Sequence, residues 1–118
     1  MAGSGRLTTH VLDTAHGRPA AGMRLDLLMI HDDHSHHVLT AHTNDDGRVE
    51  KPLLEGDRFN MGTFELIFHV GVYFEQQGLS LDNQFLDIVP VRFSMTELSH
   101  YHVPLLVSPF GYSTYRGS

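Results

Sequence analysis

The sequence predicts an all-β fold, either a sandwich or a barrel. Turn signals recur every eight to fifteen residues along the 118 residues, with short β-rich runs between them. Several runs alternate apolar and polar side chains, which is typical of strands with one buried face. Hydrophobic residues make up 41% of the chain and charged residues 19%, as in globular domains. We therefore expect one domain over residues 1–118, with residues 1–6 flexible.

The first half of the chain is expected to hold four strands. Residues 7–12 alternate, and the turn-forming His16-Gly17-Arg18-Pro19 ends them. Asn44-Asp45-Asp46-Gly47 is a strong turn, because Asx side chains tolerate left-handed backbone and Gly takes positive φ freely. The other expected strands of this half are residues 23–30, 38–43 and the very short 48–50, with a turn at Asp32-Asp33.

The second half mixes one short helix with further strands. Residues 63–70 form an expected strand, and one or two helical turns follow over 72–77 until Gly78 stops them. Residues 88–95 and 101–107 are expected to pair antiparallel, and residues 112–116 form a last strand. Pro90 and Pro104 cannot donate hydrogen bonds to a neighbouring strand, so we expect them at strand ends, edges or bulges.

Composition excludes several classes of function. The net charge of −6 disfavours nucleic acid, which needs clustered cations, and the single lysine, Lys51, leaves no basic membrane patch. The absence of cysteine excludes disulfides and thiolate metal sites. No apolar run is long enough to span a bilayer, and no secretory signal is visible at the start. We therefore expect a cytoplasmic protein.

Ten histidines are present, and five of them lie together around the expected turn at residues 31–42. With Asp32 and Asp33 they could form a divalent metal site. The alternative is a solvated turn, which we favour because nothing in the spacing fixes a tetrahedral set of ligands. We therefore expect no metal site.

His10 and His102 are isolated, and each lies in an expected strand on the face opposite an apolar row. A polar residue in the middle of a strand usually just faces solvent. Arg48, after the Asp-Gly turn, is by itself an ordinary surface arginine. The chain end, Tyr115-Arg116-Gly117-Ser118, is unusual because it is aromatic and cationic where termini are usually featureless. An imidazole row near such an end indicates the wall of a polar pocket.

Three segments together resemble the 5-hydroxyisourate hydrolases, the transthyretin-related enzymes of urate catabolism. They are the opening Leu7-Thr8-Thr9-His10-Val11-Leu12-Asp13, the Asn44-Asp45-Asp46-Gly47-Arg48 turn, and His102-Val103-Pro104-Leu105-Leu106 with the terminal Tyr-Arg-Gly-Ser. The resemblance spans essentially the whole chain, and the terminal signature separates these hydrolases from transthyretin proper.

The resemblance implies a catalytic set and a substrate-binding set. Water attack on a ring carbonyl needs a base of near-neutral pKa, which His10 or His102 supplies, and a cation for the oxyanion, which Arg48 supplies. Which histidine is the base stays open, and His100, of the same strand parity, could assist. The implied catalytic residues are His10, Arg48, His102 and Ser118, the last aligning water through its hydroxyl or terminal carboxylate. The implied substrate-binding residues are His10, Arg48, Tyr115, Arg116 and Gly117.

The resemblance also implies architecture and partners. It predicts a transthyretin-like two-sheet β-sandwich of seven or eight strands with one short helix. It further implies a homotetramer, a dimer of dimers with active sites in the channel between dimers, that hydrolyses 5-hydroxyisourate without a cofactor. One alternative is a carrier of a small hydrophobic molecule, which would want apolar residues where this chain has His10, His102 and Arg116. Another is a metal-binding protein built on residues 31–42.

Overall fold

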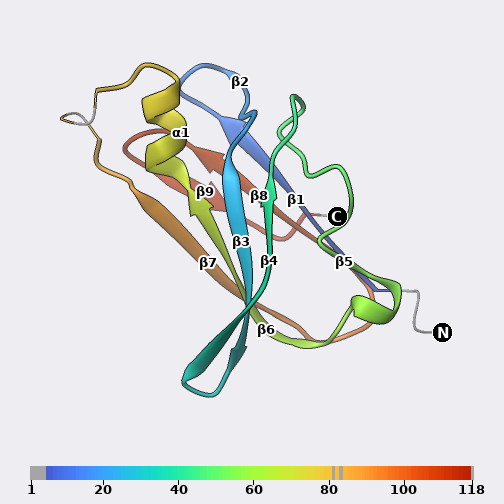
Figure 1. Ribbon diagram of the computed structural model, residues 1–118. Coiled ribbons are helices and arrows are strands. Elements are labelled where there is room, and N and C mark those ends of the chain that lie inside the picture. The colour runs from blue at the N-terminus through green and yellow to red at the C-terminus, as the bar shows by residue number, and fades with distance from the viewer. Residues whose placement is uncertain (1–4, 81, 83, 118) are drawn as a thin grey trace.

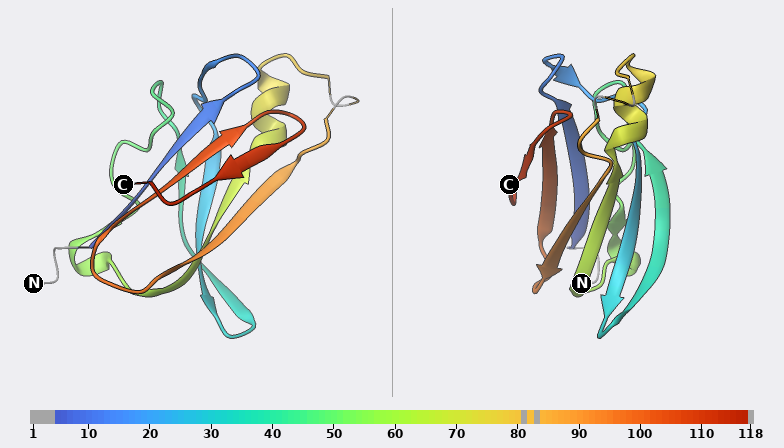
Figure 2. Two further views of the ribbon diagram at one scale, coloured as in Figure 1. Left: turned by 180° about the vertical axis from the view of Figure 1, so that it is seen from behind. Right: turned by 90° about the vertical axis from the view of Figure 1, so that its left-hand side faces the viewer.

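The computed structural model describes residues 5–80, 82 and 84–117, and in these residues two β-sheets pack face to face (Figures 1 and 2). One sheet has the strand order β2-β1-β8-β9, with β5 also paired to β1, and the other has the order β4-β3-β6-β7. The first sheet consists of β1 (Arg6–Asp13), β2 (Arg18–Pro19), β5 (Leu54–Glu55), β8 (His100–Val107) and β9 (Tyr112–Thr114). The second consists of β3 (Arg24–His31), β4 (His34–His42), β6 (Gly62–His69) and β7 (Ile88–Met95). The expectation of an all-β sandwich is confirmed.

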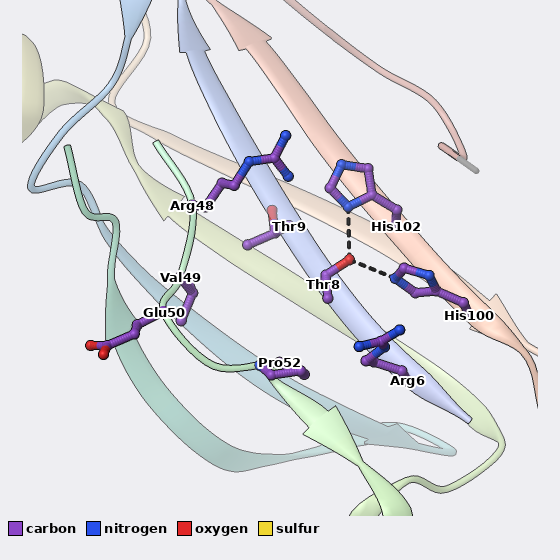
Figure 3. A pocket seen from close by; sticks show the side chains of 9 residues that line it. All are labelled: Arg6, Thr8, Thr9, Arg48, Val49, Glu50, Pro52, His100 and His102. Atoms are coloured by element: carbon purple, nitrogen blue, oxygen red, sulfur yellow. Dashed lines mark hydrogen bonds between the residues drawn. The ribbon is translucent and has the colours of Figure 1, made fainter. Parts of the chain in front are cut away.

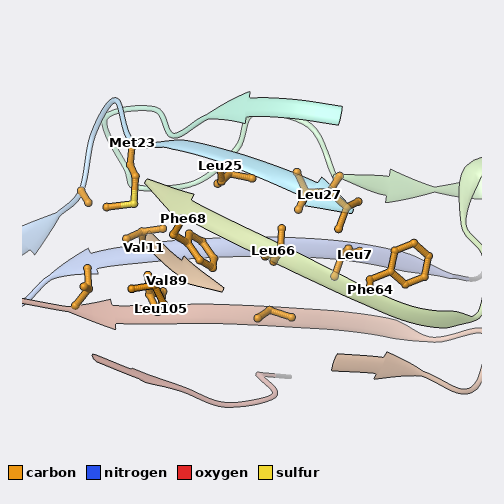
Figure 4. Packing of buried hydrophobic residues seen from close by; sticks show 14 of the residues in the cluster. Leu7, Val11, Met23, Leu25, Leu27, Phe64, Leu66, Phe68, Val89 and Leu105 are labelled. Atoms are coloured by element: carbon orange, nitrogen blue, oxygen red, sulfur yellow. The ribbon is translucent and has the colours of Figure 1, made fainter. Parts of the chain in front are cut away.

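The core lies between the two sheets (Figure 4). In β1 the odd-numbered residues Leu7 and Val11 are fully buried, and in β8 the same is true of Leu105 and Val107. Side chains alternate along a strand, so the even-numbered residues of β1 and β8 must face the outside of their sheet. The alternation that buries the core thus also places a row of polar side chains on one outer face.

One α-helix is present in the described residues, α1 (Val70–Gln76), and it covers one end of the sandwich between β6 and β7 (Figure 1). It buries Val70, Tyr73 and Phe74, and the Tyr73 hydroxyl donates to the buried carboxylate of Asp13 at 2.7 Å. Gly78 follows with a positive φ of 99°, as expected of a residue that ends a helix. The helix begins at Val70, two residues before the expected start. No helix in the described part of the chain is long and apolar enough to cross a membrane.

The expected antiparallel pairing of residues 88–95 with 101–107 is wrong. β7 pairs with β6, whereas β8 runs parallel to β1 and antiparallel to β9, so the two strands belong to different sheets. The chain crosses between sheets at residues 96–99, where the Tyr101 hydroxyl accepts the N–H groups of Thr96 and Glu97. β8 buries Val103, Pro104 and Leu105 in succession, which is typical of a central strand.

Three smaller expectations also differ from the structure. Pro90 lies on the edge strand β7, as expected, but Pro104 lies inside the central strand β8. There β8 pairs with β9 only from Leu105 onward, and the Thr114 hydroxyl donates to the Pro104 carbonyl at 2.7 Å. The expected strand over residues 48–50 is reduced to one bridge between His10 and Arg48, and β1 begins at Arg6, inside the segment expected to be flexible.

Candidate active site

The site begins with the parallel pairing of β1 and β8, which sets two polar rows side by side. Thr8 lies opposite His102 in the register, and His10 lies opposite Pro104. Because both strands turn their odd-numbered side chains into the core, Thr8, His10, His100 and His102 share one outer face. Strands that are more than ninety residues apart in sequence thereby bring the predicted histidines together.

Arg48 is brought to the same face by the tight turn that precedes it. The Asn44 side-chain oxygen accepts the N–H groups of Asp46 and Arg48 at 2.9 and 3.1 Å, which fixes the turn. Gly47 has a φ of 74°, its carbonyl accepts the Val11 N–H at 2.8 Å, and a Cβ here would collide with the Val11 carbonyl. The turn is therefore pressed against β1, and the backbone of Arg48 bridges to His10.

A cavity of about 410 Å³ lies between this turn and the two strands (Figure 3). Its size is that of sites for small molecules. In Figure 3 the Arg48 guanidinium points toward the His102 ring. The ring of His10 has its centroid 6.4 Å from that of His102. The lining residues are Arg6, Thr8, Thr9, Arg48, Val49, Glu50, Pro52, His100 and His102.

The surroundings of both predicted histidines lower their pKa and so favour the neutral imidazole. Burial lowers the pKa of His102, and the positive charge of Arg48 and the neighbouring His10 and His100 lower it further. Burial, followed by the charge of Arg48, also lowers the pKa of His10, although Asp46 opposes this. A neutral imidazole is able to accept a proton, and a permanent cation lies beside it. The site therefore combines a base with a group that can stabilise developing negative charge.

The Thr8 hydroxyl is a polar group of the cavity wall that the sequence did not predict. It lies 2.8 Å from Nδ1 of the half-buried His102 and 3.0 Å from Nε2 of the exposed His100. The signal was available, since Thr8 has the same strand parity as His10. What the sequence could not supply is the register that sets Thr8 opposite His102.

The chain end contacts the site through Gly117. The Gly117 N–H donates to the His102 carbonyl at 2.7 Å, and a Cβ on Gly117 would come within 2.6 Å of the His102 ring carbon Cδ2. Only glycine therefore fits against the ring as it is placed. Ser118, predicted to be catalytic, lies outside the described residues.

Tyr115 and Arg116, the other two residues of the terminal signature, lie away from the histidine cavity. The Arg116 guanidinium lies over the Tyr101 ring, with its carbon 4.1 Å from the ring centroid. Arg116 and Tyr115 line a second cavity of about 280 Å³, together with Val91 and Phe93 of β7. The single chain brings His10, Arg48, His102 and Gly117 together, but not Tyr115 and Arg116, whose substrate-binding role stays a prediction.

The histidine-rich segment at residues 31–42 forms the β3–β4 turn and strand β4, and the tip of this hairpin lies at the opposite end of the sandwich from α1 (Figure 1). His37 contacts the Asp26 carboxylate at 3.2 Å, as does His69 of β6 at 2.8 Å. Burial raises the pKa of Asp26, but the hydrogen bond from Thr40, those with His69 and His37, and the charge of Arg24 together hold it well below its usual range. Within the described residues, no group of three or more His, Asp or Glu side chains is placed to hold a metal ion.

Fold and site together define a β-sandwich protein with acid–base groups on an outer sheet face. The model of the HIUase/Transthyretin family matches residues 7–117. A relative from Rhizobium meliloti (strain 1021), 5-hydroxyisourate hydrolase 2, is 59% identical over 120 residues and is covered, like this chain, to 100%. The chain belongs to the HIUase/Transthyretin family, and it is an enzyme.

Solved structures agree with this assignment. The structure of a Klebsiella pneumoniae 5-hydroxyisourate hydrolase gives a TM-score of 0.79 at 28% identity, covering 97% of this chain and 94% of that one. Sea bream transthyretin in complex with thyroxine gives a TM-score of 0.85 at 26% identity, covering 95% and 94%. The transthyretin-like form of the sandwich is thereby confirmed.

Proposed function

We propose that this enzyme hydrolyses 5-hydroxyisourate to 2-oxo-4-hydroxy-4-carboxy-5-ureidoimidazoline, a step of urate catabolism. The observation that carries the proposal is that Arg48 and His102 line one small polar cavity, while His10 lies beside both of them, bridged to Arg48 and with its ring centroid 6.4 Å from that of His102. The names of the relatives, which are similar over the whole chain, support the choice of substrate.

The proposed reaction is the opening of the six-membered ring by water. His10 or His102, neutral because its pKa is lowered, takes a proton from water as the water attacks a ring carbonyl. Arg48 stabilises the oxyanion that develops on the carbonyl oxygen. The ring nitrogen then leaves with a proton from one of the two imidazoles, and no step needs a cofactor.

We place the reaction in a homotetramer, a dimer of dimers with the active sites in the channel between dimers. Two features of the described chain support this assembly. β7 and β9 end their sheets, and an edge strand offers backbone groups to another chain. The polar cavity lies on an outer sheet face, where a second dimer would exclude water from it. In the assembled enzyme Tyr115, Arg116 and Ser118 complete the site, with Ser118 aligning the attacking water.

A carrier of a small hydrophobic molecule is the alternative, since a transthyretin structure with thyroxine is among those similar to this chain. The cavity argues against it. Imidazole and guanidinium groups that line a channel must be desolvated by an apolar ligand and receive no hydrogen bonds in return.

The test is to add the purified protein to a urate oxidase reaction and follow the absorbance of 5-hydroxyisourate. We expect the absorbance to disappear at a rate proportional to protein concentration, and NMR of the mixture to show the ring-opened carboxylate. A carrier would instead protect or sequester the compound. An unchanged rate of decay would overturn the proposed function.

A further inference from the structure

We propose that Thr8 and His100 are positioning residues that move charge away from His102 during the reaction, through a hydrogen-bonded chain His102–Thr8–His100. The inference rests on the proposed function, because it concerns the same hydrolysis. It adds two residues that lie beyond the predicted catalytic set.

The geometry of the chain carries the inference. One hydroxyl oxygen, Oγ1 of Thr8, is within hydrogen-bond distance of Nδ1 of His102 at 2.8 Å and of Nε2 of His100 at 3.0 Å. Figure 3 shows the hydroxyl between the two rings, both of which reach it from β8. A hydroxyl has a single proton, so with two neutral imidazoles it donates to one ring and accepts from the other.

Two arrangements of the protons satisfy this chain. In the first, His102 donates from Nδ1 to Thr8 and Thr8 donates to His100, which leaves a free lone pair on Nε2 of His102. In the second, His100 donates to Thr8 and Thr8 donates to His102, so Nε2 of His102 carries a proton. The first form of His102 is a base and the second is an acid. The first becomes the second when the two protons of the chain shift toward His100 and Nε2 of His102 gains a proton, and His100 is neutral again once its Nδ1 loses one.

Over one complete reaction every proton of the chain returns to its starting atom, so no additional proton transfer is needed before the next turnover. As Nε2 of His102 takes a proton from water, the Nδ1 proton passes to Oγ1 of Thr8 and the Thr8 proton passes to Nε2 of His100. His102 stays neutral and His100 becomes the imidazolium. When Nε2 of His102 gives its proton to the leaving ring nitrogen, Thr8 returns a proton to Nδ1 and His100 returns one to Thr8.

The shift is favourable because of where the two rings lie. His102 is half-buried beside Arg48, so a positive charge on it is opposed by burial and by a neighbouring cation. His100 is exposed, and although Arg6 lines the same cavity, water screens a charge there. The negative charge of Glu50, which also lines the cavity, offsets the positive charge of Arg6. The chain thus lets His102 act as base and acid without itself holding a full charge.

Thr8→Val removes the hydroxyl at nearly constant volume, Thr8→Ser keeps it, and Thr63→Val, on the other sheet, is the matched control. We expect Thr8→Val to lower kcat by about tenfold or more, with KM changed by less than about threefold. Thr8→Ser should recover most of kcat, and Thr63→Val should equal the wild type. If Thr8→Ser is as slow as Thr8→Val, or if Thr8→Val acts on KM alone, the chain does not operate.

A double-mutant cycle tests the coupling between the two positioning residues. His100→Gln can still hydrogen-bond to Thr8 but cannot hold the proton, so we expect it to lower kcat as Thr8→Val does. The variant with both changes should be no slower than the slower single variant, because one chain is broken in each. Losses that multiply would show two independent effects and overturn the proposal.

Solvent isotope effects separate proton movement from packing. The wild-type kcat should depend on the deuterium fraction of the solvent along a curve, because several protons move together, and Thr8→Val should give a straight line. A straight line for the wild type would contradict the chain. Wild-type turnover of 5-hydroxyisourate is measured first, so failure of the proposed function is seen independently of failure of the chain.

Discussion

His102 is held by contacts from two distant parts of the chain. The Thr8 hydroxyl of β1 reaches its Nδ1, and Gly117 near the chain end binds its carbonyl and leaves room for its ring. A side chain fixed from both sides keeps one rotamer, so its free ring nitrogen has a fixed direction. Precise placement of this kind supplies much of the rate enhancement by acid–base groups.

Loss of either predicted histidine should abolish most of the activity without unfolding the enzyme. We expect His10→Ala and His102→Ala each to lower kcat by about a hundredfold or more. Both side chains lie on the outer sheet face, so little core packing is removed, and the melting temperature should change by only a few degrees. Circular dichroism melts and the absorbance assay check the two halves of this prediction. Near-normal turnover of either variant would remove that residue from the catalytic set.

The pH dependence follows from the direction of the two pKa shifts. Because the pKa of each histidine is lowered from 6.5, the neutral imidazole persists to lower pH than in a free histidine. The activity should therefore fall on the acid side with a midpoint below pH 6.5, and this apparent pKa belongs to the coupled pair. A pH–rate profile measured in the wild type checks this. An acid limb centred above pH 7, or no acid limb down to about pH 5, would contradict a neutral imidazole base.

At the level of elements, local patterns predicted most strands but not their partners. Alternation located β1, β6 and β8 to within a residue or two, because one face of each is apolar. The assignment of β7 and β8 to different sheets depends on the corner at residues 96–99, which local patterns do not reveal. Likewise the sequence placed His10, Arg48 and His102 in one site only through resemblance, and it missed Thr8 because the register was unknown.

The contact of the terminal segment with β8 gives a prediction at this scale. Gly117→Ala introduces a Cβ that would come within 2.6 Å of the His102 ring, so the ring must turn or the segment must move away. We expect kcat to fall by roughly tenfold or more, since a misplaced catalytic group is costly. Gly111→Ala is the control, because nothing lies within 4 Å of a Cβ there. Equal activity of the two variants would show that the contact with His102 does not matter for catalysis.

In the whole molecule, the inner and outer faces of the sheets have different roles. The faces between the sheets form the core, whereas the outer face of the β1–β8 pair carries the polar site. A site on an outer face is open to water in the single chain. In the proposed assembly a second dimer would exclude that water from the reaction. The edge strands β7 and β9 and the second cavity beside them lie apart from the histidine cavity.

Extension of the chain should therefore be tolerated at one end and not at the other. Residues added after Ser118 should lower kcat strongly, because Gly117 is fixed against His102 and any addition must leave from that point. Residues added before Met1 should have little effect. Removal of Arg116-Gly117-Ser118 should be as harmful as an extension at this end. Full activity of an enzyme tagged after Ser118, or trimmed there by a carboxypeptidase, would refute a role for the chain end.

We propose that 5-hydroxyisourate is hydrolysed in the cavity that Arg48 and His102 line, with His10 beside it. The most direct test compares kcat for this substrate in Arg48→Gln, in the wild type and in Arg58→Gln, a change at an exposed arginine of the short 3₁₀ helix Gly56–Arg58. Loss of one group that stabilises an oxyanion costs about a hundredfold to a thousandfold in kcat. We predict a loss of that size for Arg48→Gln and none for Arg58→Gln. An Arg48→Gln enzyme that hydrolyses 5-hydroxyisourate at the wild-type rate would contradict the account.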